Sequence, residues 1–535
     1  MPIVYRLAET QGDMEQIFRL NYKTFVEEIP QHAPHEDRVL VDRFHAENTY
    51  VIAVDGERLA GMLAVRDRRP FSLDTKVTDL EELLPFRPKH MIEIRLLAID
   101  RAYRGSRLLY GLIRYLDRYM EKRDFEMAVI SGTTRELKLY KHLGFIPFGG
   151  LVGSEQACYQ PMYMTPASYE ASGAYALLHK TARFTAGPVE ILPEVTRALL
   201  RRPVSHRSGA FRKLYDQVRS RLLAMTGARA ADIWLGSGTL ANDAVAGELS
   251  RMGGRGLVLA SGEFGYRLMR QAERWQLDFD AITCEYGRAF DYAQLEAAVG
   301  QGSYAWLWAV HGETSTGVLQ DLERLKGLTS RHGVALALDC ISSLGAVPLS
   351  LQGVRWATGV SGKALGSYTG LSFVLYGEAG SAARVGHDPE PHIPPYLDAA
   401  LYRHAQGIPF SHSSNLLAAL DAALAVYERH DPYAVLAERG ERLRASLSAM
   451  GLQVLAEPGH ETPYIVTIVL PAQLSSHALG EHMADQGFEL QYESEYLRAR
   501  NWVQIACMGA LRARDMASML EHLEGYVSQA GVAAR

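Results

Sequence analysis

Apolar and polar positions follow different patterns in the two halves of the chain. In residues 1–165, TYVIAVDG and RLAGMLAVRD flank a turn at Asp55 and Gly56, which predicts a β-hairpin. HMIEIRLLAID and EMAVISGT predict further strands. The segment SRLLYGLIRYLDRYMEKR carries apolar residues at i, i+3 and i+4, which predicts a helix, and RELKLYKHLGF predicts a shorter one. Strands and helices therefore alternate here, as in an α/β domain.

From about residue 181, short apolar strands are separated by longer helices. The strand segments are ADIWLGSG, GLVLASG, YAWLWAV, GVALALD, WATGVSG and LSFVLYG, and they do not alternate strictly. Such strands are typical of a mainly parallel sheet that helices cover on both faces. After about residue 430, PYIVTIVL and WVQIACMG between helices predict a small α/β subdomain.

These patterns divide the chain into four segments. Residues 166–180 include SYEASGAYALLH, a small and polar stretch that predicts a linker. We therefore expect an α/β domain at 1–165, the linker at 166–180, a large domain at 181–430 and a small subdomain at 431–535. A chain of 535 residues is long enough for two to four domains.

Composition narrows the class of protein. A hydrophobic content of 47% and a charged content of 22% are those of a soluble globular chain. A net charge of −5 gives no broad electrostatic footprint for nucleic acid or an anionic membrane. The first residues do not form a signal peptide, and no apolar run reaches membrane-spanning length. The four cysteines fit neither a zinc pattern nor a disulfide framework, so we expect no metal site and a cytoplasmic protein.

Polar residues stand where several of the predicted strands end, the edge at which open α/β sheets bind ligands. GSGTLAND would place hydroxyls and backbone N–H groups at a helix N-terminus, which suits a phosphate. Each feature also has an ordinary structural interpretation, such as a helix cap or a core phenylalanine. The candidates are Ser237, Gly238 and Thr239, then Phe264 in SGEFGYR, Thr314 and Ser315 in HGETSTGVL, and Asp339 in GVALALDC.

A single lysine lies among small residues in GVSGKALGSYTG. Lys363 has glycines on both sides, and glycine lets a backbone or a flat ligand approach closely. A buried lysine tends to lose its proton and become a nucleophile. On this stretch alone, an exposed lysine in a turn is the ordinary alternative.

Taken together and in order, these features resemble the class V aminotransferases of fold type I. A phosphate cradle, an aromatic face, a hydroxyl, a carboxylate and a lysine are the parts that hold pyridoxal 5'-phosphate. The resemblance extends over about residues 181–530 and includes FTAGPVEILPEV, HRSGAFRKL, GSGTLAND, SGEFGYR, HGETSTGVLQDL, LDCISSLGAVPL and SGKALGSYTG. The family includes alanine–glyoxylate, serine–glyoxylate and aminoethylphosphonate transaminases.

The resemblance implies a role for each ring-binding residue. Lys363 corresponds to the lysine that forms the internal aldimine with the cofactor. Asp339 corresponds to the carboxylate that pairs with the pyridinium nitrogen. Phe264 would stack on the ring, and Thr314 would bond near its phenolic oxygen. The implied reaction is transamination of a small amine or amino acid, with Lys363 moving the proton.

The resemblance also implies how the cofactor's phosphate is held. Ser237, Gly238 and Thr239 match the family's phosphate turn. PFSHSSNLLAAL matches a segment that the dimer partner contributes, so Ser413 is a candidate contact across a homodimer. Gly362 stands where the family often has glutamine, which removes one cofactor contact.

Residues 1–165 resemble a Gcn5-related N-acyltransferase (GNAT) domain of the autoinducer synthase and long-chain N-acyl amino acid synthase branch. YRGSRLLYGLI follows a strand and begins a helix, where the family binds the pyrophosphate of coenzyme A. Arg104 and Gly105 fit this loop, whereas Arg107 and Leu109 replace the small residues that are usual there. The implied co-substrate is acyl-CoA or acetyl-CoA, and an acyl carrier protein is a candidate partner.

Two further residues of this domain are candidates for catalysis. Tyr140 in YKHLGF matches a tyrosine that often protonates the leaving thiolate. Glu93 on the strand HMIEIRLLAID is either a base or a structural carboxylate.

The leading hypothesis is a bifunctional enzyme in which transamination is coupled to N-acylation by the first domain. One alternative is a pyridoxal-phosphate lyase or desulfurase, which would need a mobile catalytic cysteine such as Cys507. Another is an aminotransferase whose first domain senses acyl thioesters without transferring the acyl group.

One residue that the family commonly has is missing. The late strand of class V aminotransferases carries an arginine for the substrate α-carboxylate, whereas NWVQIACMG places Gln504 there. Either Arg498 or Arg500, just upstream, binds the carboxylate, or the main substrate lacks one. Gln504 and Arg500 are therefore the candidate substrate-binding residues.

Overall fold

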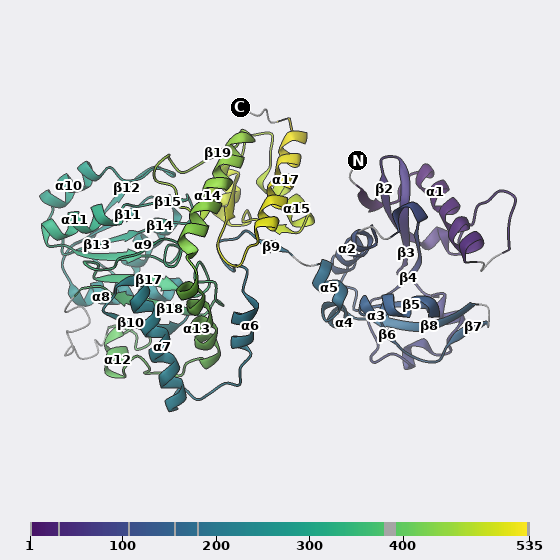
Figure 1. The fold of residues 1–535 in the computed structure, drawn as a ribbon, viewed down its shortest axis with the longest axis horizontal. Helices are drawn as coiled ribbons and strands as arrows, with labels where there is room; N and C mark the ends of the chain where they lie inside the picture. The colour runs from purple at the N-terminus through teal and green to yellow at the C-terminus, as the bar shows by residue number, and fades with distance from the viewer. Residues whose placement is uncertain are drawn as a thin grey trace. The chain divides into compact units, whose positions relative to one another are not determined.

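The computed structural model describes residues 3–29, 33–104, 108–154, 157–178, 181–378 and 392–531 (Figure 1). The chain divides into two compact units, Met1–Lys180 and Thr181–Arg535. Among the described helices, none is both long and apolar enough to cross a membrane.

The first unit is built on an eight-stranded sheet with the order β1-β2-β3-β4-β5-β8-β6, and β7 pairs with β8. All of these pairs are antiparallel except the parallel pair of β4 and β5. The strands are β1 (Val4–Leu7), β2 (Thr49–Asp55), β3 (Arg58–Arg66), β4 (Met91–Ile99), β5 (Met127–Thr133), β6 (Ile146–Pro147), β7 (Val152–Ser154) and β8 (Ala157–Met164).

The central strands of this sheet separate along their length. β4 pairs with β5 only from Met91 to Glu93. Further along β4, Leu96 has a φ of 52° and the pairing of β4 with β3 shifts register. The carboxyl-terminal halves of β4 and β5 therefore diverge. The helices of this unit are α1 (Gln11–Tyr22), α2 (Leu108–Glu121), α3 (Leu137–His142), α4 (Pro166–Glu170) and α5 (Gly173–Leu178).

The segment that we predicted to be a linker is instead helical and belongs to the first unit. Thr165 and Ser168 form a reciprocal capping box that starts α4. Tyr169 and Ala174 are buried in the core that α2 and β5 also form. A small and polar composition therefore did not identify a linker, because two residues in it provide enough apolar surface to dock the segment.

The second unit contains a seven-stranded sheet with the order β10-β18-β17-β16-β13-β11-β12. Only β18 runs antiparallel to its neighbours, so the sheet is mainly parallel, as predicted. β11, β13, β16 and β18 are buried over their whole length, which explains why their sequences do not alternate. The strands are β10 (Ala230–Leu235), β11 (Gly256–Ala260), β12 (Phe279–Thr283), β13 (Trp306–Val310), β16 (Ala335–Asp339), β17 (Trp356–Val360) and β18 (Leu371–Tyr376).

Helices and two short strand pairs complete the large part of this unit. The helices are α6 (Pro193–Leu199), α7 (Gly209–Thr226), α8 (Gly238–Met252), α9 (Glu263–Arg274), α10 (Tyr292–Gln301), α11 (Leu322–His332), α12 (Ala399–His404) and α13 (Ser414–Arg429). β14 (Gly312–Glu313) pairs with β15 (Val318–Leu319), and β9 (Ala182–Arg183) pairs with β21 (Phe488–Glu489).

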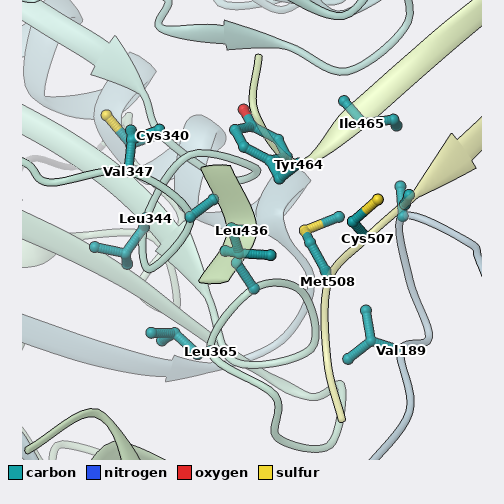
Figure 2. Close-up of a cluster of buried hydrophobic side chains, with 14 of the residues drawn as sticks. Val189, Cys340, Leu344, Val347, Leu365, Leu436, Tyr464, Ile465, Cys507 and Met508 are labelled. Atoms are coloured by element: carbon teal, nitrogen blue, oxygen red, sulfur yellow. The ribbon is translucent and has the colours of Figure 1, made fainter. Parts of the chain in front are cut away.

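The C-terminal part forms the small α/β layer that the sequence predicted. Its antiparallel strands are β19 (Gln453–Val454), β20 (Ile465–Val469) and β22 (Trp502–Ala506), and its helices are α14 (Pro432–Ala449), α15 (Ser476–Asp485), α16 (Glu495–Arg500) and α17 (Ala513–Gln529). One apolar cluster joins this part to the large sheet: Leu344 and Leu365 lie in it with Leu436, Tyr464 and Met508 (Figure 2).

Candidate active site

Five strands of the second unit, β10, β11, β13, β16 and β17, run in the same direction, so their carboxyl ends lie at one edge of the sheet. The turns after these strands surround a cavity of about 270 Å³. The predicted residues that line it are Gly238, Thr239, Phe264, Thr314, Asp339 and Lys363. The structure thus brings together most of the side chains that the sequence predicted for this site.

A buried carboxylate forms the floor of the cavity. Asp339 ends β16, and its exposed fraction is 4%. Its oxygens accept hydrogen bonds from the Asn242 amide at 2.8 Å and from the Ile341 N–H at 2.9 Å. Burial raises the pKa of Asp339, and these two donors offset that effect only in part. No lysine or arginine in the described parts of the chain forms an ion pair with Asp339, and the charges of Lys363 and Arg267 favour its ionised form only in part.

The lysine that the sequence singled out faces the same cavity. Its Nζ lies 3.4 Å from the Thr314 hydroxyl oxygen and 5.4 Å from the centroid of the Phe264 ring. Desolvation lowers the pKa of Lys363 to about 8, against the opposing charge of Asp339. A substantial fraction of the amine is therefore unprotonated near neutral pH, which a nucleophilic or basic lysine requires.

Glu313 holds the aromatic side chain in place. This buried carboxylate accepts hydrogen bonds from the Phe264 and Gly265 N–H groups at the start of α9, and from the Ser315 N–H and hydroxyl. It thereby joins the turn after β13 to the helix that carries Phe264. The ring position is set by a hydrogen-bonded carboxylate at a helix N-terminus.

The start of α8 provides an anion site. Gly238 and Thr239 line the cavity, and Ser237 stands at the N-cap without using its side chain to cap the helix. A Cβ at Gly238 would lie 2.4 Å from the Ile341 side chain, so a larger residue there would require that side chain to shift. Unpaired N–H groups at the first turn of a helix of 15 residues favour a phosphate.

The first unit has a cavity of its own, of about 360 Å³. It lies where β4 and β5 diverge, and its walls include residues of α2, α3, α4 and α5. Tyr140 and Ser131 line it among mostly apolar neighbours. Burial raises the pKa of Tyr140, so the phenol stays protonated and can donate a proton.

The other predicted residues of this unit have different surroundings. Glu93 is fully buried and accepts hydrogen bonds from the Ser72 N–H and hydroxyl and from the Leu73 N–H, so it acts as a structural carboxylate. Arg104 pairs with Glu28 and donates to the Ile99 carbonyl at 3.0 Å. Gly105 and Arg107 lie outside the described residues, and Leu109 follows the first residue of α2.

Sequence comparison identifies both units. Residues 20–114 match the family model of the acetyltransferase (GNAT) domain, and residues 194–380 match that of aminotransferase class V. A 2-aminoethylphosphonate–pyruvate transaminase of Burkholderia ambifaria is 27% identical over 359 residues, which cover 64% of this chain and 95% of the relative. The soluble hydrogenase 42 kDa subunit of Anabaena cylindrica is 27% identical over 65% of this chain and 96% of its own.

Solved structures agree with the sequence matches. An alanine–glyoxylate aminotransferase of Nostoc sp. superposes with a TM-score of 0.59 at 26% identity, covering 65% of this chain and 95% of that one. A ureidoglycine–glyoxylate aminotransferase of Bacillus subtilis has the same fold, with a TM-score of 0.61 at 21% identity over 66% of this chain and 95% of its own.

The chain carries a class V aminotransferase domain and a GNAT domain.

Class V aminotransferases use pyridoxal phosphate, and the residues of the aminotransferase domain fit that group. Asp339 lacks a cationic partner, which a protonated ring nitrogen would supply. Phe264 offers an aromatic face, and the first turn of α8 offers an anion site. Gly187, with a φ of 154°, lies against the lysine: a Cβ there would meet the Gly362 carbonyl oxygen at 3.2 Å. The cavity is therefore shaped for a flat, anionic ring beside Lys363.

Gln504, predicted to bind substrate, does not line the cavity of the aminotransferase domain. It is fully buried, and its amide donates to the Thr314 carbonyl at 2.6 Å and to the Thr467 hydroxyl at 2.8 Å. Its oxygen accepts from the Tyr496 hydroxyl at 2.9 Å. Both ends of the amide are used within the protein, so Gln504 holds the Thr314 turn in position.

The arginines of α16 also lie away from the cavity lining. The Arg500 guanidinium stacks 4.5 Å from the Tyr286 ring centroid and 5.4 Å from that of Trp502, and it donates to the Tyr496 carbonyl. Arg498 is exposed on the same helix. Ser413 caps α13 of its own chain by accepting from the Leu416 N–H.

The cysteines give no support to the desulfurase alternative. Cys507 is buried among apolar side chains that include Ile465 and Met508 (Figure 2). Burial raises the pKa of Cys507 to about 12, so its thiol is not ionised near neutral pH.

The sequence analysis missed several residues of the site. Glu313 adjoins a predicted hydroxyl, and a carboxylate directly after a buried apolar strand is a signal that we did not use. Arg267 lines the cavity one helical turn after Phe264, a spacing that places both on one face of a helix. Gln491 also lines it and accepts from the Ala186 N–H at 3.2 Å, through a contact about three hundred residues away in sequence that no local pattern could reveal.

Proposed function

We propose that this chain is a bifunctional enzyme. Its aminotransferase domain transaminates a small amine or amino acid with pyridoxal phosphate bound to Lys363. Its GNAT domain transfers an acyl group from an acyl thioester, such as acyl-CoA or acyl carrier protein, to an amine that the other domain uses or makes.

One observation supports the first activity: Lys363, Asp339 and Phe264 line a single cavity. The pKa of Lys363 is lowered to about 8 and that of the buried Asp339 is raised, and shifted pKa values of groups that share a cavity are typical of a functional site. The desulfurase alternative would place a reactive cysteine at this cavity, and none of the described cysteines lines it.

Each residue then has a defined task. When bound, pyridoxal phosphate supplies an electron sink for the amine-bearing carbon of the substrate. Asp339 holds the proton on the ring nitrogen, and Asn242 fixes the orientation of that carboxylate. Lys363 removes the proton from the amine-bearing carbon, and Thr314 lies within reach of its Nζ to orient it.

A donor screen tests this activity. The purified protein should be yellow, and at least one amine should convert its absorbance near 420 nm to that of pyridoxamine phosphate, with release of an oxo product. Absence of conversion with every amine, amino acid and aminophosphonate tried would contradict the aminotransferase assignment.

The cavity of the GNAT domain supports the second activity. In the proposed step the amine nitrogen attacks the thioester carbonyl carbon, the C–S bond breaks, and Tyr140 gives its proton to the departing thiolate. The proton that the nitrogen loses in forming the amide then restores the Tyr140 phenol. The carboxylates of Asp117, Glu121 and Glu170 also line this cavity, and negative charge favours an amine over an anionic acceptor.

Mass spectrometry tests the acyl transfer. The full-length protein should acylate a product or donor of its own aminotransferase domain when acetyl-CoA, longer acyl-CoA or acyl carrier protein is supplied. Linking the two activities in one chain would raise the local concentration of the shared amine. Binding of an acyl thioester without any transfer would favour the sensor alternative.

We also propose that the protein is a homodimer in which Ser413 contacts the phosphate of the partner's cofactor. Ser413→Ala should weaken cofactor retention several-fold, and Ser475→Ala, which alters the equivalent cap of α15, should not. A fully active monomer in sedimentation would contradict the homodimer.

A further inference from the structure

The aminotransferase cavity contains a cationic group that the proposed reaction has not used. Arg267 lies on α9 and lines the cavity with Lys363 and Asp339. Its guanidinium carbon is 4.7 Å from the centroid of the Phe264 ring, and the Lys363 Nζ is 5.4 Å from the same centroid. Both cations are thus close to the same aromatic ring.

Arg267 has no anionic partner among the residues that the structure describes. Its neighbours on α9 differ in this respect: Arg270, one turn further along, pairs with Glu263 at 3.0 Å. The contact of Arg267 with Phe264 satisfies one face of the guanidinium and leaves its five N–H donors available. A guanidinium that lines a cavity without forming an ion pair with any carboxylate there is typical of a site that binds an anionic ligand.

The other candidates for this role are already engaged. Gln504 is buried and fully hydrogen-bonded, Arg500 stacks on Tyr286 and Trp502, and Arg498 is exposed on α16. The anion site at the start of α8 belongs to the phosphate of the cofactor under the proposed function. The cavity therefore needs a second anion-binding group only if the substrate itself is anionic.

We propose that Arg267 binds the carboxylate of an amino acid or 2-oxo acid substrate. This inference rests on the proposed transamination. Arg267 takes the role of the arginine that the sequence lacks at position 504. The guanidinium forms a bidentate pair with the carboxylate, while Lys363 acts on the amine-bearing carbon. Main substrates therefore carry a carboxylate, contrary to the option of a carboxylate-free donor.

Propionate tests the site directly, because it has a carboxylate but no amine and cannot react. Its dissociation constant is measured from the change in the cofactor absorbance or fluorescence, with neutral propionamide as a comparison. Arg267→Gln should weaken propionate binding at least tenfold and leave propionamide unchanged, while Arg267→Lys should recover only part of the loss. Arg270→Gln is the matched control on the same helix and should leave both constants unchanged.

A second measurement separates substrate binding from a role in holding the cofactor. The dissociation constant of pyridoxal phosphate, measured by titration of the apoprotein, should differ by less than threefold between wild type and Arg267→Gln. A large loss of cofactor affinity with unchanged propionate binding would show that Arg267 supports Phe264 or the phosphate, and would overturn the inference.

The outcomes also distinguish this inference from the proposed function. If the wild type transaminates and Arg267→Gln keeps both its affinity for propionate and its KM for 2-oxo acids, only the inference fails. If no donor is converted, the proposed function fails, and the propionate constants still decide whether the arginine binds a carboxylate. A higher KM for pyruvate with the KM for a carboxylate-free amine unchanged would support both.

Discussion

The cavity of the aminotransferase domain and the cavity of the GNAT domain differ in what lines them. The first combines a lysine, an arginine and a carboxylate with polar turns at the carboxyl ends of parallel strands. The second lies between two diverging strands and is lined mainly by apolar side chains, with Tyr140 and Ser131 among them. Polar groups at strand ends leave a visible pattern in the sequence, whereas a space between diverging strands does not.

The difference also concerns how each cavity acts. In the aminotransferase domain, burial shifts pKa values, and hydrogen bonds hold the reactive groups in place. In the GNAT domain, the proposed acyl transfer would use the apolar lining to bind an acyl chain by excluding water from it, and would involve few groups in proton transfer. Substitutions of charged residues should therefore matter most in the first cavity.

The largest effect is expected for Lys363→Ala. Transamination should fall by at least about 10⁴-fold, because no other group in the cavity is placed to move the proton. Acyl transfer by the GNAT domain should be unchanged. Lys326→Ala is the matched control, since Lys326 pairs with Glu323 on the surface of α11. Residual transamination above one hundredth of the wild-type rate would contradict the assignment, whatever the control does.

A loss of about 100-fold or more in transamination is expected for Asp339→Asn, because a neutral amide does not stabilise a protonated ring nitrogen.

The stability of the apoprotein, unlike its activity, should gain from the same substitution as pH rises. Burial raises the pKa of Asp339, so the folded apoprotein binds this proton more tightly than the unfolded chain does, and its carboxylate costs stability as pH rises above about 4. The melting temperature of the apo variant relative to the apo wild type should therefore increase between pH 4 and pH 7. A decrease over that range would indicate that the carboxylate is stabilised by the protein alone.

Tyr140→Phe should affect only the other cavity. Acyl transfer should slow by about 100-fold or more, the usual contribution of a positioned acid, while transamination stays within twofold. Tyr103→Phe, which removes a hydroxyl bonded to Asp55 away from the cavity, serves as the control. An equal loss of both activities would mean that the two cavities are not independent.

The smallest expected effect is the change with pH in the rate at which the apoprotein captures the cofactor. Only the unprotonated Lys363 amine can capture pyridoxal phosphate, and its pKa is lowered to about 8. The rate of cofactor capture by the apoprotein should therefore rise about tenfold from pH 7 to pH 9, with a midpoint near 8. Stopped-flow absorbance measures it. A midpoint above 10 would mean that the lysine is solvated as an ordinary surface residue.

Much of the fold followed from the apolar pattern. Buried strands without alternation predicted the mainly parallel sheet, and the periodic stripe in LLYGLIRYLDRYME predicted α2. The helices α4 and α5 were missed because their composition is that of a linker and their docking depends on Tyr169 reaching a core formed by distant strands.

The site residues that directly follow strands could be predicted from the sequence. The residues that tertiary contacts bring to the site could not. Lys363, Asp339, Phe264 and Thr314 each lie in a short polar or glycine-rich turn. Gln504 was expected to face the substrate because of its strand position, but Tyr496 and Thr314 use both ends of its amide. The sequence predicted which strand carries Gln504, whereas its hydrogen-bond partners determine the structural role of its side chain.

The central claim is that Lys363 carries the cofactor in the aminotransferase domain. Reduction of the yellow protein with borohydride, digestion and mass spectrometry of the labelled peptide test this directly. The account predicts that the pyridoxyl group is found on the peptide containing Lys363, with Lys363→Ala unlabelled. A label on a different lysine of the wild-type protein, or an unlabelled protein that still transaminates, would contradict it.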